Sequence, residues 1–499
     1  MAIEQFKLTF NFMKHIISIT LFLLVLNSYA QERFLTKDSL RKDMDLLHQV
    51  LDKVHAGTYR YLSKTELSQE FEKFNSDLPS TISEREFMIR LAQLVNKIKC
   101  GHTYLNPWNM VTKVRERLFD KPINFPVGIE VVNGRFYVTE NVSQHQSIKR
   151  GAEILSLNGI SSQTIYNKLS TIAKRDGNNI NSNDSYLSIS NYGLRDWEAF
   201  ELYYSLFFPA ENELVAIEYQ NYNTEELKKA DLQLLTKKER QNKMNSAYGD
   251  ISAARKEWKL IILDDDKAIL KIGTFAIWNW EGFNYKKWLS ETFMKINEAG
   301  IKSLIVDIRG NGGGDSDAKD ELLSYLVTEK IQRKEDTRSL IRTTRLPESL
   351  VPHSRTYLKV LIDGLPKNQY ETFDSTYYLF KKGINTVSIA PKKKGFRGQT
   401  YILGDGSNTS ATYTMLHLAK TYGFAKFVGS ESGGNLQGIN GSQYIFFYLP
   451  HSKMEIDIPL IHSQPTGQMP DRGVLPDIEV KRTQRSIATE KDPFLQFIE

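Results

Sequence analysis

Cysteine is almost absent from this chain. Among its 499 residues there is only Cys100, so an intramolecular disulfide cannot form. Histidine is also sparse: the 9 histidines form neither an HxH nor an HExxH pair, and Cys100 with His102 offers only a fragment of a metal site. We therefore expect neither a disulfide-stapled fold nor a metal or other cofactor.

A strong charge imbalance is absent too. The 65 basic and 59 acidic residues leave a formal net charge of only +6. The dense basic run Lys392–Lys394 has no aromatic residues interleaved with it, which is typical of a solvated loop and not of a nucleic-acid footprint. Nucleic acid is therefore not an expected partner.

Long apolar runs are missing except near the N-terminus. Met13–His15 leads into Ile16–Leu26, which is too short for a comfortable membrane span, and small residues stand before Gln31 where a signal peptidase reads. We expect residues 1–30 to be a signal peptide, with Met13 as a candidate for the true start, and the mature chain to be periplasmic or extracellular without a stable membrane anchor. A membrane anchor at the same place is the alternative.

The rest of the composition is that of a folded protein with more than one core. It is 40% hydrophobic and 25% charged. After the leader we divide the chain into a helical region at 31–105, a β-rich module with an insertion or linker at 106–250, and an α/β domain at 251–499.

The helical region leads into His102. Its third expected helix delivers the chain to Gly101 and His102, where a lone histidine is ordinarily a C-cap or a surface residue. The expected helix caps are Asp38 ahead of Ser39–His55, Ser63 with Glu66, and Ser83 with Glu86.

The module at 106–250 begins with short strands. Val127–Val132 and Phe136–Thr139 flank an Asn133-Gly134 turn of the hairpin type. Residues 170–250 are rich in asparagine and then in charge, and we expect there an insertion or linker without chemistry, containing one strand at Leu214–Tyr219.

The α/β domain is organised around a buried strand that ends in glycines. Leu304–Ile308 is apolar and β-branched, as in a central strand buried on both faces, and Gly312–Gly314 follow it. Three interpretations remain open for this glycine loop: a tight turn before a helix, a phosphate cradle and an oxyanion hole. A strand at Lys267–Ile272 should open the domain, whereas 333–397 shows no periodicity and fits a lid or strap.

The stretch Leu304–Gly314, which reads LIVDIRGNGGG, resembles the signature of the S41 serine peptidases. This family includes the C-terminal processing, or tail-specific, proteases and the tricorn core protease. The resemblance implies an α/β catalytic core of the crotonase/ClpP-like type. Residues 151–159, with a strand and an Asn-Gly turn, are similar to part of a PDZ domain, so a PDZ-like module is expected within 106–250; an unrelated β-domain is the alternative.

The same resemblance implies a nucleophile and an oxyanion hole. Ser410 opens a helix in the way that the family's catalytic serine does, although a serine there is also a common helix cap. The N–H groups of Ala411 and Gly313 would then hold the oxyanion.

Two bases occur in the family, a lysine or a histidine. The matching segment Gly429–Gly438 contains no lysine and has Asn435 where the lysine would align, so the resemblance favours His102. A histidine is also neutral and basic near pH 7 without a large pKa shift. The acid that supports it is expected to be Asp471, with Glu431 as the second candidate.

These residues predict an exported serine endopeptidase that acts on polypeptides, with their C-termini as a candidate site of action. A non-catalytic ligand- or peptide-binding protein on the same scaffold is the main alternative. A crotonase-type acyl-CoA enzyme conflicts with the export signal, and Cys100 as nucleophile lacks an oxyanion loop in its own segment.

Overall fold

The computed structural model describes residues 32–190, 198–250, 253, 256–264, 266–332, 337–356, 359–381 and 388–496. The expected signal peptide at 1–30 and Met13 lie outside these ranges, so both stay predictions. Within the described ranges, no helix combines the length and the apolarity that a membrane crossing requires.

A six-stranded sheet forms the centre of the C-terminal half. All of its neighbouring strands run parallel except β9, which is antiparallel to β10. The expectation that the strand before the glycine loop is central is confirmed, because β11 lies between β10 and β18. The order is β22 (Ile478–Glu479), β19 (Lys426–Gly429), β18 (Gln399–Gly404), β11 (Ser303–Asp307), β10 (Lys267–Ile272) and β9 (Trp258–Ile262).

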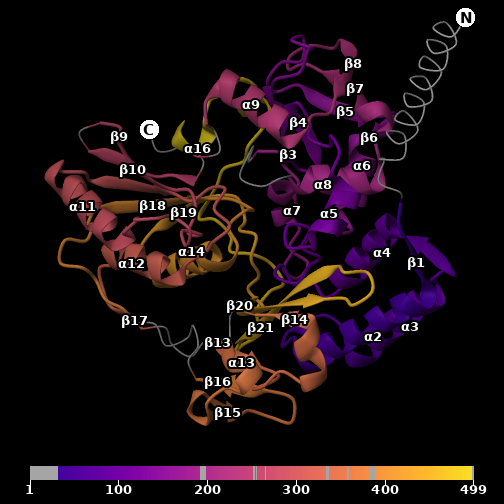
Figure 1. The fold of residues 1–499 in the computed structure, drawn as a ribbon. Coiled ribbons are helices and arrows are strands. Elements are labelled where there is room, and N and C mark those ends of the chain that lie inside the picture. The colour runs from indigo at the N-terminus through magenta and orange to yellow at the C-terminus, as the bar shows by residue number, and fades with distance from the viewer. Residues whose placement is uncertain are drawn as a thin grey trace, which may run out of the picture.

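Alternating residues of these strands bury the two faces of the sheet. Leu270 and Val306 belong to the larger core, which also contains the apolar faces of α11 (Tyr285–Glu298), α12 (Ser316–Leu326) and α14 (Ser410–Tyr422). The opposite face, with Ile305 and Leu403, is covered by Phe494 near the C-terminus. Figure 1 shows the three helices on one side of the sheet and α16 (Pro493–Gln496) on the other.

A second six-stranded sheet is antiparallel throughout. Much of it comes from the interval 333–397, where the sequence shows no periodicity; the described part of that interval forms strands, and whether it acts as a lid or strap stays a prediction. Its strands are short and pair with distant segments, which hides them from a search for periodicity. They are β14 (Ser354–Arg355), β20 (Asn440–Tyr448), β21 (Glu455–Pro465), β13 (Thr337–Ile341), β16 (Tyr378–Phe380) and β15 (Tyr370–Thr372).

The N-terminal region is helical, as expected. Ser63 forms the capping box with Glu66, and the Ser83 hydroxyl accepts the Glu86 N–H. The Asp38 cap is wrong: α2 starts two residues earlier, after Thr36, because the chain enters it from a strand. The elements are β1 (Phe34–Thr36), α2 (Lys37–Lys53), α3 (Lys64–Ser76), β2 (Thr81–Ser83), α4 (Glu84–Asn96) and α5 (Thr112–Phe119).

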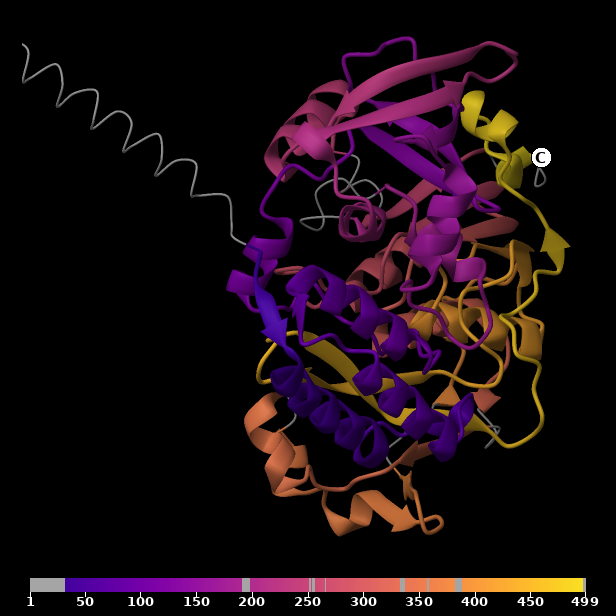
Figure 2. The ribbon, with the colours of Figure 1, turned by 90° about the vertical axis from the view of Figure 1, so that its right-hand side faces the viewer.

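The third sheet occupies the module at 106–250. The Asn133-Gly134 turn has φ values of 52° and 75°, as a hairpin turn of the expected type requires. One continuous apolar core joins this sheet to the N-terminal helices and to β20 and β21; Figure 2 shows the helices, in indigo, between the module above and the orange segment below. The order is β3 (Val127–Val132), β4 (Arg135–Asn141), β5 (Glu153–Leu157), β7 (Leu214–Gln220) and β8 (Leu227–Gln233), with β6 (Ile160–Ser161) beside β5.

For 170–250 we expected an insertion or linker, and the structure contradicts the linker. After α6 (Ser162–Ser170) this stretch forms α7 (Asn181–Tyr186), α8 (Ala199–Phe207), β7, β8 and α9 (Lys237–Tyr248). α8 lies in the core, and its Phe200 ring packs edge-on against Phe125 and Phe136. Buried Glu201 on the same helix pairs with buried Arg240 on α9.

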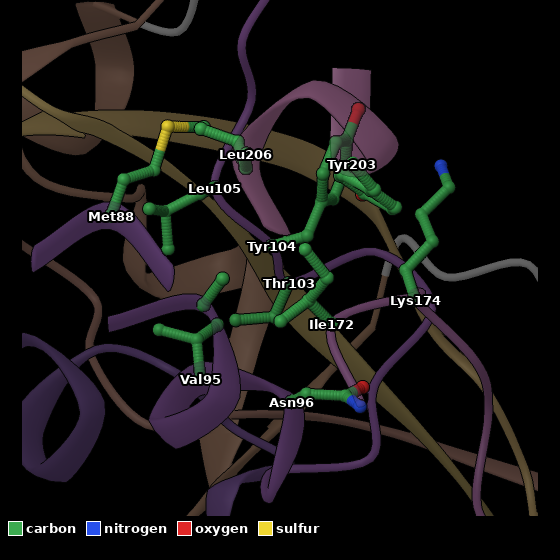
Figure 3. A pocket seen from close by; sticks show the side chains of 11 residues that line it. Met88, Val95, Asn96, Thr103, Tyr104, Leu105, Ile172, Lys174, Tyr203 and Leu206 are labelled. Carbon is green, nitrogen blue, oxygen red and sulfur yellow. The ribbon is translucent and has the colours of Figure 1, made fainter. Parts of the chain in front are cut away.

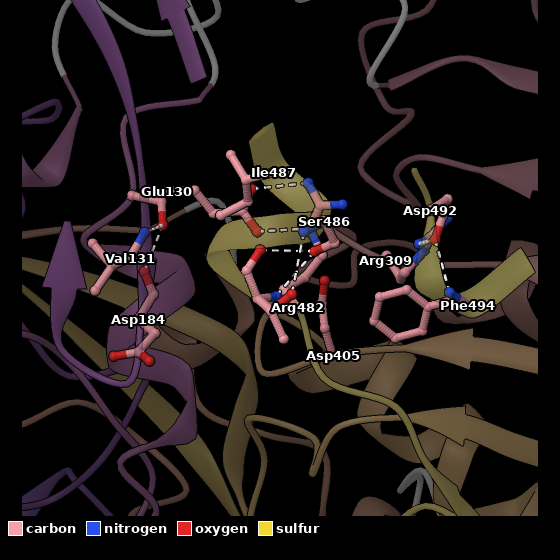
Figure 4. Close-up of polar contacts among 12 residues, drawn as sticks. Glu130, Val131, Asp184, Arg309, Asp405, Arg482, Ser486, Ile487, Asp492 and Phe494 are labelled. Carbon is pink, nitrogen blue, oxygen red and sulfur yellow. Dashed lines mark hydrogen bonds and ion pairs between the residues drawn. The ribbon is translucent and has the colours of Figure 1, made fainter. Parts of the chain in front are cut away.

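The C-terminal segment joins the module to the central sheet. Arg482 donates to both carboxylate oxygens of Glu130 on β3, at 2.9 and 3.0 Å. Further along, Arg309 at the end of β11 donates to Asp492 at 3.0 Å. Figure 4 shows both contacts on either side of α15 (Gln484–Ala488), so the last residues of the chain hold two parts of the fold together.

The buried pair of Glu201 and Arg240 yields a stability prediction. Arg240→Met should lower the free energy of unfolding by about 3–5 kcal/mol, because it leaves a carboxylate buried without its partner. Adding Glu201→Leu should restore only part of the loss, since Glu201 also accepts the Phe125 N–H at 2.8 Å. Thermal unfolding measures this; Arg345→Met, in an exposed ion pair with Glu348, is the control and should change little.

Candidate active site

Ser410 is the first residue of α14 and has an unusual backbone. Its φ is 51°, in the left-handed region that residues with side chains rarely adopt. Strain of this kind persists where the surroundings enforce it, and it is typical of a sharp strand-to-helix turn that presents a nucleophilic side chain. Here the turn joins the end of β18, at Gly404, to α14.

Three side chains fasten this turn to the glycine loop. Asn408 Nδ2 donates to the carbonyl groups of Ile308, at 2.7 Å, and Asn311, at 3.0 Å. Thr409 and Thr412 add hydroxyl bonds to loop carbonyls, at 2.9 and 2.8 Å. The loop after β11 and the turn before α14 therefore form one unit, although they are far apart in the sequence.

Gly313 and Ala411, the two expected oxyanion donors, lie side by side. A Cβ atom on Gly313 would stand 2.9 Å from the Ala411 nitrogen and 2.9 Å from Ser410 Cβ. The Ala411 N–H has no acceptor among the described residues. The Gly313 N–H, in contrast, donates to the buried Asn311 Oδ1 at 2.9 Å, so one donor is available and the other is engaged.

His102 lies on a segment that pairs with β21. The Asn106 N–H donates to the Glu455 carbonyl at 3.2 Å, and the Asp457 N–H donates to the Tyr104 carbonyl at 3.1 Å. A single antiparallel bridge, between Leu105 and Ile456, thus attaches this segment to β21 at a position that does not pair with β13. The imidazole ring lies 6.0 Å from the Tyr444 ring, centre to centre.

The segment after His102 is tightly packed against the helical region. Thr103, Tyr104 and Leu105 line a cavity of only about 10 Å³ together with Met88 and Leu206 (Figure 3). This is about the least space that holds one water molecule, so the cavity is a packing gap and not a ligand site.

The environment of His102 favours the neutral imidazole. Burial lowers its pKa below the usual 6.5, Asp176 opposes this with its negative charge, and Lys174 adds to the lowering. Nδ1 is buried and has no hydrogen-bond partner within the described residues. A neutral imidazole at pH 7 is the form that can accept a proton.

No hydrogen bond joins His102 to Ser410 in the described part of the chain. The segment Asp176–Ser182 connects their surroundings instead. At one end, Asp176 Oδ1 accepts the Gly101 N–H at 2.9 Å. At the other, the Asn181 carbonyl lies 2.1 Å from where a Cβ on Gly406, in the Ser410 turn, would stand.

Asp471 holds this connecting segment and does not hydrogen-bond His102 in the structure. Its Oδ1 accepts the Asn178 N–H at 3.0 Å and the Asn435 amide at 2.6 Å. Burial by itself would raise the pKa of Asp471, but these bonds and the charge of Lys99 lower it, so the group is ionised at neutral pH.

Glu431, the second candidate for the acid, is engaged elsewhere. Its carboxylate accepts the Arg472 guanidinium at 3.0 Å and the Gly473 N–H at 2.8 Å. Cys100 is buried, and burial raises the pKa of its thiol, so it is not an activated nucleophile. No cluster of three or more potential metal ligands occurs in the ranges that the structure describes.

Asp176 is the residue near His102 that sequence reasoning missed. It lies in the asparagine-rich stretch that we expected to be a linker, within the run Asp176–Asn179. Such a run is typical of turns, and nothing local in it indicates contact with Gly101. Asp176 and Gly101 come together only because the chain crosses from the module to the helical region.

The glycine loop yields a second stability prediction. A Cβ on Gly314 would stand 2.1 Å from the Phe275 carbonyl carbon, whereas a Cβ on Gly310 meets nothing within 4 Å; both residues have positive φ. Gly310→Ala should therefore cost only about 1–2 kcal/mol of backbone strain. The Gly314→Ala variant should lose more stability, because its Cβ would push the loop away from the backbone of Phe275, which follows β10. Chemical denaturation of both variants measures the difference, and equal losses would contradict the packing described.

Comparison with known proteins agrees with this architecture. Residues 268–480 match the model of peptidase family S41. Mature CPAF complexed with lactacystin is similar in fold, with a TM-score of 0.61 and 13% identity over 93% of this chain and 97% of that chain; mature CPAF alone gives 0.59 and 12% over 93% and 96%.

A photosystem II D1 C-terminal processing protease is also similar, with a TM-score of 0.43 and 11% identity over 92% of this chain and 100% of that chain. No curated protein matches the chain by sequence. The chain is thus a mixed α/β protein with the S41 peptidase fold, and its match to the model of peptidase family S41 covers residues 268–480.

Proposed function

We propose that this protein is an exported serine endopeptidase that hydrolyses peptide bonds of polypeptide substrates. The observation that carries the proposal is the Ser410 turn: a serine with positive φ at a helix N-terminus, fastened to a glycine loop, beside an Ala411 N–H without an acceptor in the described chain. Helix N-terminal N–H groups stabilise developing negative charge, which is what acyl transfer requires.

In the proposed reaction, Ser410 Oγ attacks the peptide carbonyl while His102 Nε2 takes the hydroxyl proton. The Ala411 N–H binds the oxyanion, joined by the Gly313 N–H once it exchanges Asn311 Oδ1 for the substrate oxygen. His102 then gives its proton to the leaving amine, and water hydrolyses the acyl-enzyme by the same steps in reverse. His102 and Ser410 must approach for this, and catalytic hydrogen bonds are often loose before substrate binds.

The module at 106–250 is proposed to present the substrate. As a PDZ-like unit it would add an extended peptide to a sheet edge through main-chain hydrogen bonds. Export follows from the expected signal peptide at 1–30, and the polypeptide substrate would then be met in the periplasm or outside the cell.

A non-catalytic binding protein on the same scaffold is the second candidate. The observation in its favour is that His102 and Ser410 share no hydrogen bond, while the Gly313 N–H is already engaged by Asn311. Covalent reactivity of Ser410 distinguishes the two candidates.

Labelling by a fluorophosphonate probe tests the proposed nucleophile and base. The wild-type chain should be labelled and Ser410→Ala should not, because the probe reacts only with an activated hydroxyl. His102→Gln should slow labelling by about 100-fold or more. Ser407→Ala, in the same turn, is the control and should keep the wild-type rate; labelling that survives Ser410→Ala removes this residue from the mechanism.

The pH dependence of labelling tests the state of His102. Protonated imidazole cannot accept the Ser410 proton, so the rate should rise with pH through the pKa of His102. Since burial lowers this pKa below 6.5, the rise should be complete by neutral pH. A rate that keeps rising well above neutral pH would instead indicate a base of higher pKa.

A further inference from the structure

Asp176 is a buried carboxylate beside the proposed base. Only 2% of its surface is exposed, and its Oδ1 accepts the Gly101 N–H, one residue before His102. Its Oδ2 lies 2.7 Å from where a Cβ on Gly101 would stand, so only glycine at position 101 permits this close approach. Burying a carboxylate costs free energy, so we expect a buried carboxylate at this position to have a role.

The other two candidate acids have their oxygens occupied. Asp471 takes hydrogen bonds from Asn178 and Asn435, and Glu431 takes them from Arg472 and Gly473. Asp176 Oδ2, in contrast, accepts no hydrogen bond from any residue that the structure describes. The buried His102 Nδ1, which also lacks a partner there, is a donor in the tautomer that leaves Nε2 free for Ser410.

The charges around the imidazole single out the same carboxylate. The titratable neighbours are Asp176 and Lys174 from the segment after α6, Cys100 on the histidine's own segment, and Tyr444 on β20. Burial raises the pKa values of Cys100 and Tyr444, so both are neutral at pH 7. Within this group, Asp176 alone can stabilise a positive imidazolium.

We propose that Asp176 is the positioning residue of the base: it accepts the Nδ1 proton of His102 and stabilises the imidazolium that forms when Ser410 loses its proton. Asp471 acts indirectly, by helping to hold the turn that contains Asp176. Asn435 Nδ2 donates both to Asp471 Oδ1, at 2.6 Å, and to the Asp176 carbonyl, at 3.1 Å, and so holds the Asp176 turn in place. This inference rests on the proposed peptidase function, but its first test does not require activity.

The first test measures the pKa of His102 by NMR titration of its ring protons in full-length Ser410→Ala protein. Adding Asp176→Asn keeps an oxygen that can accept the Gly101 N–H but removes the charge, so the pKa of His102 should fall by about one unit. Asp363→Asn, at an exposed position on α13 (Lys359–Asp363), makes the same chemical change far from the imidazole and should leave the pKa unchanged.

The second test compares fluorophosphonate labelling of variants that retain Ser410. Asp176→Asn should slow labelling by at least about tenfold with unchanged circular dichroism, because the imidazolium loses its counter-charge. Asp471→Asn should slow it less, since the charge at 176 remains. If Asp176→Asn does not fold, Gly101→Ala takes its place: its Cβ displaces the carboxylate and should likewise slow labelling.

The outcomes separate the two proposals. A wild-type chain that is never labelled defeats the peptidase function, and the NMR titration still decides the role of Asp176. If Asp176→Asn changes neither the pKa of His102 nor the labelling rate, the positioning role is overturned. A larger effect of Asp471→Asn than of Asp176→Asn in both measurements also overturns the positioning role of Asp176. It would indicate that Asp471 is the acid that supports His102.

Discussion

The close backbone packing of the glycine loop against the Ser410 turn is the constraint on which the rest of the site depends. Gly314 lies against the backbone of Phe275, and Gly313 against the nitrogen of Ala411, at distances that leave no room for a side chain. The loop therefore has to end a buried strand, and the serine has to begin a helix on the neighbouring strand of the same sheet. Parallel neighbours β11 and β18 meet this requirement, because their carboxyl ends lie at one edge.

His102, the base that we propose, is positioned by other parts of the fold. His102 is held by the pairing of its own segment with β21, in the second sheet, and by the turn that starts at Asp176, in the module. The helical region, the module and the second sheet also share one apolar core. The position of the imidazole relative to Ser410 thus depends on how this large unit sits on the central sheet, and so does the proton transfer that we propose.

Much of the fold could be predicted from the sequence, because its main signals are local. The strands Val127–Val132 and Lys267–Ile272 have the predicted limits, and the Ser63 cap follows from the spacing of two residues. The failures concern segments whose partners are distant: the strands within 333–397 pair with β20 and β21, and α8 is buried by residues far away in the chain. The same holds for the site. Ser410 and Gly313 could be named through the family resemblance, whereas Asp176 could not, since its contact with Gly101 crosses two structural units.

In the loop 429–438, where the family resemblance would align a lysine, this chain has Asn435. A lysine there would have to be buried to lower its pKa, and an ammonium group donates but never accepts hydrogen bonds. Asn435 does both: its amide donates to Asp471 and Asp176, and its carbonyl oxygen accepts the Gln437 N–H at 2.9 Å. The loop can then hold an acidic turn beside a histidine that comes from another part of the chain. In the mechanism that we propose, Asn435 therefore supports the use of His102 as the base, because the turn that Asn435 holds is the one that contacts the segment of His102.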